Sequence, residues 1–223
     1  MSLFVTAADD GWGGTVYNLT TAGFSVLVLI MLALVILGCS IFGKNKKFTA
    51  KQLAFSSMAI ALAMVTSYIK LFKMPMGGSV TLFSMLFIVL IGYWYGVGTG
   101  LTTALAYGIL QLVIDPYIIS FPQMLVDYLF AFGALGLSGF MAGKKHGLVK
   151  GYILGVLGRY FFSFLSGWIF FGMYAPEEFP NAVVYSLAYN GAYLGTEAAI
   201  TILVICIPPF AHGLAKVKEM ANR

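Results

Sequence analysis

Long apolar runs follow one another along almost the whole chain, and this feature constrains its fold more than any other. A helix that spans a membrane needs about 20 mostly apolar residues. Seven runs approach or exceed that length, at Tyr17–Phe42, Ala50–Phe72, Ser79–Tyr95, Val97–Ile114, Pro122–Ala142, Leu148–Gly172 and Ala182–Phe210. Only 9% of the 223 residues are charged and 60% are hydrophobic, whereas soluble domains carry about 25% and 45–50%. The sequence therefore predicts an all-α integral membrane protein.

The first apolar run stands apart from the others. The basic linker Gly43–Lys47 separates it from the run that begins at Ala50. We interpret residues 1–48 as an extra N-terminal transmembrane helix with its linker, and residues 49–223 as a six-helix membrane core.

Lysine and arginine residues gather in alternate connections of this predicted bundle. Short loops rich in these residues stay in the cytoplasm, and seven spans place all the basic clusters on one side. The clusters are Lys44, Lys46, Lys47 and Lys51, then Lys144, Lys145 and Lys150, and finally Lys216, Lys218 and Arg223. The sequence predicts a multi-pass protein of the cell membrane with its N-terminus outside and its C-terminus in the cytoplasm. Because the formal charge of +5 sits at helix ends, it indicates topology and not nucleic-acid binding.

Three ionisable residues fall inside the apolar runs, namely Asp127, Arg159 and Glu197. A charge in the hydrocarbon costs on the order of 3 kcal/mol on insertion scales, so each is a candidate functional group. Two interpretations are open. Either carboxylate could simply neutralise Arg159, or the groups could bind a ligand, and the two roles are compatible because a ligand can share a carboxylate with an arginine.

Aromatic residues concentrate in the stretch from Arg159 to Asn190, near the predicted outer ends of two helices. The rings of Phe171 and Tyr185 and the amide of Asn190 share this stretch with the buried arginine. Stacking and cation–π contacts to a flat cationic ring use such clusters. The residues alone predict a site for an aromatic, cationic molecule that arrives from outside.

Signatures of catalysis are lacking in the sequence. The two cysteines and two histidines show no metal-ligand spacing, and no Walker A string, G-x-x-x-x-G-K-[ST], occurs. The chain contains no G-x-S-x-G string, and no Ser/His pair lies within the spans. We predict no enzyme activity, no metal and no cofactor, and any coupling to ATP must come from other chains.

Four strings resemble those of the thiamine-specific S components of energy-coupling factor (ECF) vitamin transporters, which are small six-helix membrane proteins. The strings are PMGGSVTLFSM at Pro75–Met85, LVDYLFAFGALGLSG at Leu125–Gly139, RYFFSFLSGWIFFGMYAP at Arg159–Pro176 and VYSLAYNG at Val184–Gly191. They occur in the family's order and cover the core from about Ala50 onward. The first predicted helix has no counterpart in the short family members.

The resemblance implies a set of thiamine-binding residues. By position, the family's site corresponds to Asp127, Tyr128, Arg159, Phe171, Tyr185, Asn190, Tyr107, Tyr117 and Ser163. Two of the matched positions differ, because Ser163 stands where the family has histidine and Gly78 where it has tryptophan. Asp127 would offset the charge of the thiazolium, the rings would stack on the vitamin, and Arg159 would hold Asp127 or donate to a pyrimidine nitrogen.

The resemblance further implies that the chain captures thiamine at the outer face and delivers it with a transmembrane T component and two ABC-type ATPase subunits. Ala59 and Ala63 form a small-xxx-small face that would contact either the partner or another helix of the same chain. An S component for another vitamin, or for a precursor such as hydroxymethylpyrimidine, is the first alternative, because Ser163 and Gly78 differ. An intramembrane enzyme is the second, opposed by the lack of catalytic strings.

Overall fold

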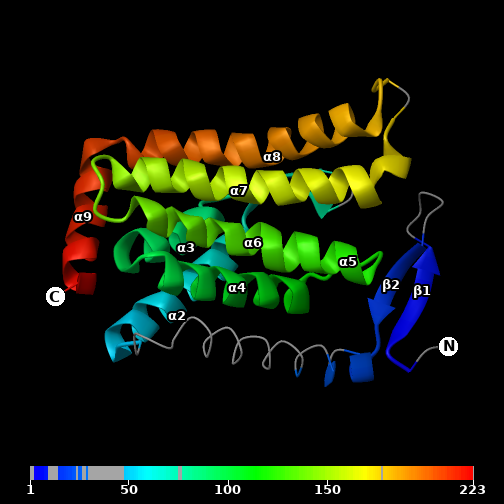
Figure 1. Ribbon diagram of the computed structural model, residues 1–223, viewed down its shortest axis with the longest axis horizontal. Helices are drawn as coiled ribbons and strands as arrows, with labels where there is room; N and C mark the ends of the chain where they lie inside the picture. The colour runs from blue at the N-terminus through cyan, green and yellow to red at the C-terminus, as the bar shows by residue number, and fades with distance from the viewer. Residues whose placement is uncertain are drawn as a thin grey trace.

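Six helical rods between residues 50 and 205 pack together and form the body of the protein (Figure 1). The computed structural model describes residues 3–9, 15–23, 25–26, 29, 48–74, 77–176 and 178–222. The rods are α2 (Ala50–Ser67), α3 (Ser84–Tyr95), α4 (Val97–Ile114), a composite rod over Phe121–Met141, α7 (Gly147–Phe170) and α8 (Ala182–Ile205). Among the described residues, α4, the composite rod and α7 are long and apolar enough to cross a membrane, and α8 joined to the next helix makes a fourth candidate.

The composite rod lies at the centre of the bundle, against α3, α4 and α7. It consists of α5 (Phe121–Met124), the π-helix η2 (Leu125–Phe130), α6 (Ala131–Gly133) and the 3₁₀-helix η3 (Ala134–Met141). Small residues allow the close packing of η3, since a Cβ atom on Gly136 would overlap the backbone nitrogen of Leu101 in α4. The π-helix is the segment that carries Asp127 and Tyr128, and π turns inside helices occur often at functional sites.

A β-hairpin connects α2 to α3, and its strands cover residues that the sequence assigned to the end of the second helix and the start of the third. Strand β3 (Lys70–Lys73) pairs antiparallel with β4 (Ser79–Thr81). The predicted end of the second helix at Phe72 and the predicted start of the third at Ser79 were therefore wrong. Gly77 has a φ of +87°, a conformation that glycine adopts without steric cost and that lets the chain turn here. Apolar periodicity alone does not distinguish such a short strand from the end of a helix.

The last predicted helix also ends early, at Ile205. Pro208 and Pro209 have no amide hydrogen to continue it, and α9 (Pro208–Asn222) starts there at 86° to α8. In Figure 1, α9 crosses the end of the bundle. The inward face of α9 includes Leu214, Lys218 and Ala221, whereas His212 and Lys216 are exposed.

The N-terminal region forms a second hairpin, β1 (Val5–Asp9) with β2 (Thr15–Leu19). The predicted start of the first helix at Tyr17 was wrong, because that residue lies in β2. Residues 21–23, 25–26 and 29 are helical, and the rest of the predicted helix Tyr17–Phe42 lies outside the described residues. The extra helix and the boundary after residue 48 stay predictions. The fourth predicted helix is confirmed residue for residue, and the fifth and sixth within two residues at each end.

Candidate functional site

A cavity of about 200 Å³ lies at the end of the bundle where α4 and α7 end and α8 begins. The hairpin β3–β4 and the start of the composite rod complete its walls. All nine residues predicted for ligand binding line this cavity: Tyr107, Tyr117, Asp127, Tyr128, Arg159, Ser163, Phe171, Tyr185 and Asn190. They come from five different segments of the chain, and the fold brings them together around one space.

The carboxylate of Asp127 is held in place by a neutral donor. Gln123, one helical turn earlier and 1% exposed, donates from Nε2 to Asp127 Oδ2 at 2.6 Å. The same amide nitrogen donates to the carbonyl oxygen of Tyr117 at 3.1 Å. No cationic nitrogen of the described residues lies within 4.0 Å of the Asp127 carboxylate, and the ion pair at this cavity joins Lys70 to Asp115. The carboxylate is thus positioned in the cavity wall with its charge uncompensated by a salt bridge.

Arg159 lines the same cavity without forming an ion pair with a carboxylate of the described residues. Its Cζ lies 4.0 Å from the centre of the Phe132 ring, a cation–π contact. Its Nε is buried and has no hydrogen-bond partner within the described part of the chain. The interpretation in which Asp127 or Glu197 forms an ion pair with Arg159 is not what the structure contains, because neither lies within 4.0 Å of the guanidinium.

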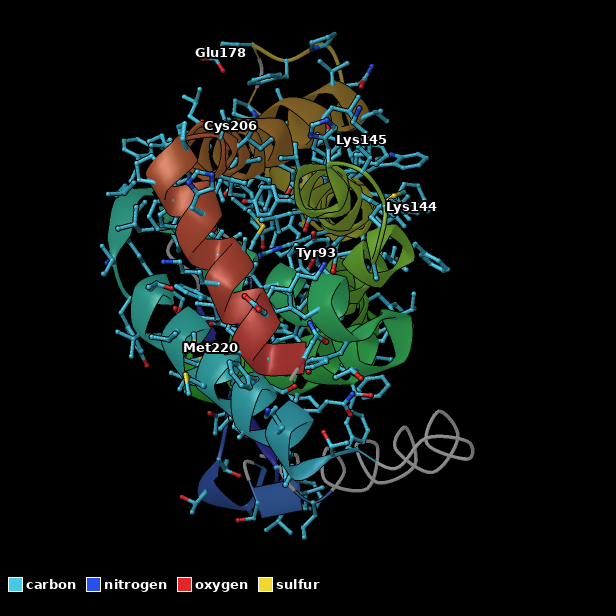
Figure 2. All side chains as sticks on the ribbon, turned by 90° about the vertical axis from the view of Figure 1, so that its left-hand side faces the viewer. Tyr93, Lys144, Lys145, Glu178, Cys206 and Met220 are labelled. Carbon is cyan, nitrogen blue, oxygen red and sulfur yellow. The ribbon has the colours of Figure 1, made fainter. Side chains whose placement is uncertain are left out.

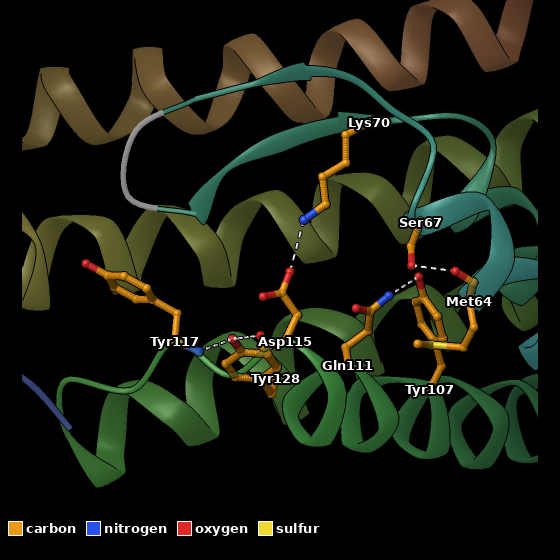
Figure 3. Close-up of polar contacts among 8 residues, drawn as sticks. All are labelled: Met64, Ser67, Lys70, Tyr107, Gln111, Asp115, Tyr117 and Tyr128. Atoms are coloured by element: carbon orange, nitrogen blue, oxygen red, sulfur yellow. Dashed lines mark hydrogen bonds and ion pairs between the residues drawn. The ribbon is translucent and has the colours of Figure 1, made fainter. Parts of the chain in front are cut away.

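Phenol groups fix the end of α4 relative to the composite rod (Figure 3). Tyr128 donates to the carbonyl oxygen of Asp115 at 3.0 Å and accepts from the backbone N–H of Tyr117 at 2.8 Å. Deeper in the cavity, Gln111 donates to the hydroxyl of Tyr107 at 2.6 Å. The two contacts of Tyr128 order the segment that carries Tyr117.

Aromatic rings form two walls of the cavity. Tyr117 and Phe171 stack with ring centres 5.8 Å apart and planes 28° from parallel. On α8, successive pairs of Tyr185, Tyr189 and Tyr193 have centres 5.7 and 5.8 Å apart. The predicted set omitted Tyr189 and Tyr193, although their spacing of four residues from Tyr185 places all three on one helix face. It also omitted Gln123, whose signal is an amide four residues before a buried acid.

The hairpin β3–β4 contacts the α8 tyrosines directly. The backbone N–H of Gly78 donates to the hydroxyl of Tyr189 at 3.0 Å, and a Cβ atom on Gly78 would lie 2.5 Å from that oxygen. On the other side of the cavity, Lys70 forms an ion pair with the largely exposed carboxylate of Asp115 at 3.0 Å (Figure 3). The position where the related family has tryptophan is therefore a glycine that makes room for Tyr189.

Glu197 is 3% exposed and lies beside the cavity wall. Its Oε2 accepts from the N–H and hydroxyl of Thr81 at 3.2 and 2.6 Å, and its Oε1 from the Ser84 hydroxyl and the Met85 N–H at 3.1 and 3.3 Å. Thr81 and Ser84 line the cavity. The carboxylate therefore joins α8 to the start of α3, a structural role that the sequence did not reveal.

The amide of Asn190 and the side chains of the two alanines of α2 contact other residues of the same chain. Asn190 donates to the carbonyl oxygen of Ser186 at 2.9 Å and accepts from the hydroxyl of Tyr193 at 3.0 Å. Ala59 and Ala63 are 7% and 0% exposed, in a helix that packs on α3 and α4. These two side chains therefore face other helices of the same chain, and docking of a partner on α2 stays a prediction.

Comparison with known proteins identifies the group to which this arrangement belongs. The model of the family described as "Thiamine transporter protein (Thia_YuaJ)" matches residues 53–216, about three quarters of the chain. The chain belongs to this family. Membership places the chain among multi-pass membrane transporters and not among enzymes, as the sequence predicted.

Individual members of the thiamine transporter family support this assignment. The thiamine transporter ThiT of Bacillus subtilis is 38% identical over 149 residues, which cover 60% of this chain and 77% of that protein. ThiT of Lacticaseibacillus paracasei is 32% identical over 96 residues, 37% of this chain and 47% of that protein. A solved structure of ThiT from Listeria monocytogenes superposes with a TM-score of 0.57 at 22% identity, over 71% of this chain and 94% of that one. That likeness supports the fold.

Proposed function

We propose that the chain binds thiamine in this cavity and acts as the S component of an ECF transporter. The observation that carries the proposal is the Asp127 carboxylate, which is positioned by Gln123 and forms no ion pair with a described residue. Thiamine supplies a permanently cationic thiazolium ring and a flat aminopyrimidine. Cavities with aromatic walls and a few placed polar groups are the usual form of small-molecule sites.

The other cavity groups have roles that suit the same ligand. Arg159 Nε, buried and without a partner in the described chain, would donate to a pyrimidine nitrogen. Phe171 and Tyr117 already stack on each other, and either ring would stack on a ring of the vitamin. Because Asn190 already bonds to Ser186 and Tyr193, its main contribution would be to hold Tyr193 at the cavity.

The distribution of charge supports capture from outside. Lys51, Lys144, Lys150 and Lys218 lie at helix ends opposite the cavity, and short basic connections face the cytoplasm. The cavity would then face outward, with the C-terminus inside. Uptake would require a T component and two ABC-type ATPase subunits, with contacts on α2, whose outward face carries Leu53, Met58 and Val65.

Calorimetric titration of the purified, detergent-solubilised chain with thiamine tests the binding step. We expect one site with a dissociation constant below about 1 μM, or about −8 kcal/mol. Hydroxymethylpyrimidine, which lacks the cationic ring, should bind far more weakly. The opposite order of affinities would contradict the thiamine assignment and favour a precursor transporter.

An uptake assay tests the assembly with partner subunits. Absence of thiamine-dependent uptake when the ATPase subunits are omitted would support the assembly.

Gly78→Ala tests the contact between the hairpin and the α8 tyrosines. The new methyl group would lie against the Tyr189 hydroxyl, and we expect the displaced ring to weaken thiamine binding about five- to thirtyfold, equal to about 1–2 kcal/mol. Gly195→Ala on α8, the helix that carries Tyr189, is the matched control, because a Cβ atom there meets nothing within 4 Å. Equal affinities for the two variants would show that Tyr189 does not shape the site.

A further inference from the structure

A second cavity, of about 450 Å³, lies at the opposite end of α7 and α8 from the proposed thiamine site. It occupies the inside of the 86° bend between α8 and α9, with the ends of α3 and α7 as its other walls. Figure 2 looks onto this end of the molecule, where α9 crosses in front of the other helices. None of the residues that line it has a role in the proposed binding of thiamine, and Lys218 entered above only in the argument for the orientation of the chain.

The walls of this cavity are mostly apolar, with Lys218 and His146 among the polar residues that line it. Leu148, Ile205 and Leu214 supply much of the apolar lining. Lys218, half-buried on the inward face of α9, places its Nζ 3.9 Å from the centre of the Tyr93 ring. The indole nitrogen of Trp94 is buried and has no hydrogen-bond partner within the described residues.

The surroundings of the cavity are strongly basic. The connection 142–150 and helix α9 together contain Lys144, Lys145, Lys150, Lys216 and Lys218, against one acidic residue, Glu219. Figure 2 shows Lys144 and Lys145 at this end of the bundle. A ligand that matches both the walls and the charge is apolar along its length and anionic at one end.

We propose that this cavity binds an anionic phospholipid of the adjacent leaflet, with an acyl chain between α8 and α9 and its phosphate at Lys218. An amphipathic helix such as α9 lies at the membrane interface, and basic pockets between membrane helices bind anionic headgroups. A partner helix fits less well. A single turn of helix, about 10 Å wide and 5.4 Å long, occupies about 420 Å³, so one turn would already fill the cavity of about 450 Å³. The proposal does not depend on the thiamine assignment.

Quenching of Trp94 by brominated lipids provides the test. The chain has three tryptophans, so Trp12→Phe with Trp168→Phe leaves Trp94 as the one reporter. The full chain in detergent micelles is titrated with phosphatidylglycerol brominated on its acyl chains, and separately with the same lipid carrying a phosphatidylcholine headgroup. We expect saturable quenching by phosphatidylglycerol, with half-saturation at an at least fivefold lower mole fraction than for phosphatidylcholine.

Two lysines of α9 give a matched comparison. Lys218→Gln should raise the half-saturation point for phosphatidylglycerol at least fivefold, whereas Lys216→Gln, which removes the same charge from the exposed face, should leave it unchanged. Ala211→Phe, which fills the cavity without changing charge, should abolish saturation. Circular dichroism and monodisperse elution establish that each variant is folded. Equal quenching by the two lipids, a linear dependence on mole fraction, or equal effects of the two lysine variants would overturn the proposal.

Discussion

Asp127→Asn is expected to weaken thiamine binding about 30- to 1,000-fold, equal to about 2–4 kcal/mol, because it leaves a buried cation without its counter-charge. The substitution keeps the size of the side chain and an oxygen that can accept from Gln123 Nε2. It removes the negative charge and replaces one acceptor oxygen with an NH2 donor, so the loss would measure the contribution of the charge together with that acceptor. The measurement is calorimetric titration of folded, monodisperse protein with thiamine.

Asp115→Asn is the matched control, since it makes the same change in the same cavity. The Asp115 side chain is 70% exposed and pairs with Lys70, and exposed ion pairs contribute about 0–1 kcal/mol. We expect its affinity to fall by a factor of three or less. If the two variants lost affinity equally, the placement of the cationic ring beside Asp127 would be wrong.

The positions of the site residues could be predicted because local strings carry them. Asp127 and Tyr128 stand in one string, and Arg159 and Phe171 in another. Once both segments are helices of one bundle, the parts that carry these residues lie near the same end of the bundle. The composite rod shows the limit of this reasoning. Its range was predicted within one residue at each end, yet nothing in its apolar pattern distinguished the π turn at Leu125–Phe130 from ordinary helix. That turn determines the direction in which Asp127 projects.

The errors share a cause. Hydropathy predicts which residues avoid water, but it does not predict whether a short apolar segment extends a helix or pairs as a strand. Leu71 and Phe72 were assigned to a helix on their apolar character, and they lie in β3 with more than half of each side chain exposed. The partner that stabilises the end of this hairpin, Glu197, is 116 residues away from Thr81. A contact of that separation has no local signal.

Removal of this distant carboxylate should have the largest effect on stability. Glu197 accepts four hydrogen bonds from Thr81, Ser84 and Met85, and α3 has no side-chain cap of its own at Phe83, whose φ is 63°. The carboxylate of α8 therefore does for α3 what a capping residue does locally: it satisfies donors at the first turn of the helix.

Glu197→Ala is expected to lower the apparent melting temperature of the detergent-solubilised chain by about 6–20 °C. Each buried donor left without a partner costs about 1–3 kcal/mol before the structure relaxes, and we expect a total loss of stability of about 3–5 kcal/mol. For a chain of this size, each kcal/mol lowers the melting temperature by about 2–4 °C. Thr196→Ala, next to it, removes one exposed bond to the Ala192 carbonyl oxygen and should shift the melting temperature by less than about 2 °C, within the ordinary range for surface changes. Because Thr81 and Ser84 line the cavity, Glu197→Ala should also weaken thiamine binding below the melting transition. A normal melting temperature with lost binding would instead make Glu197 a ligand-binding group, and normal values of both would show that water replaces the carboxylate without cost.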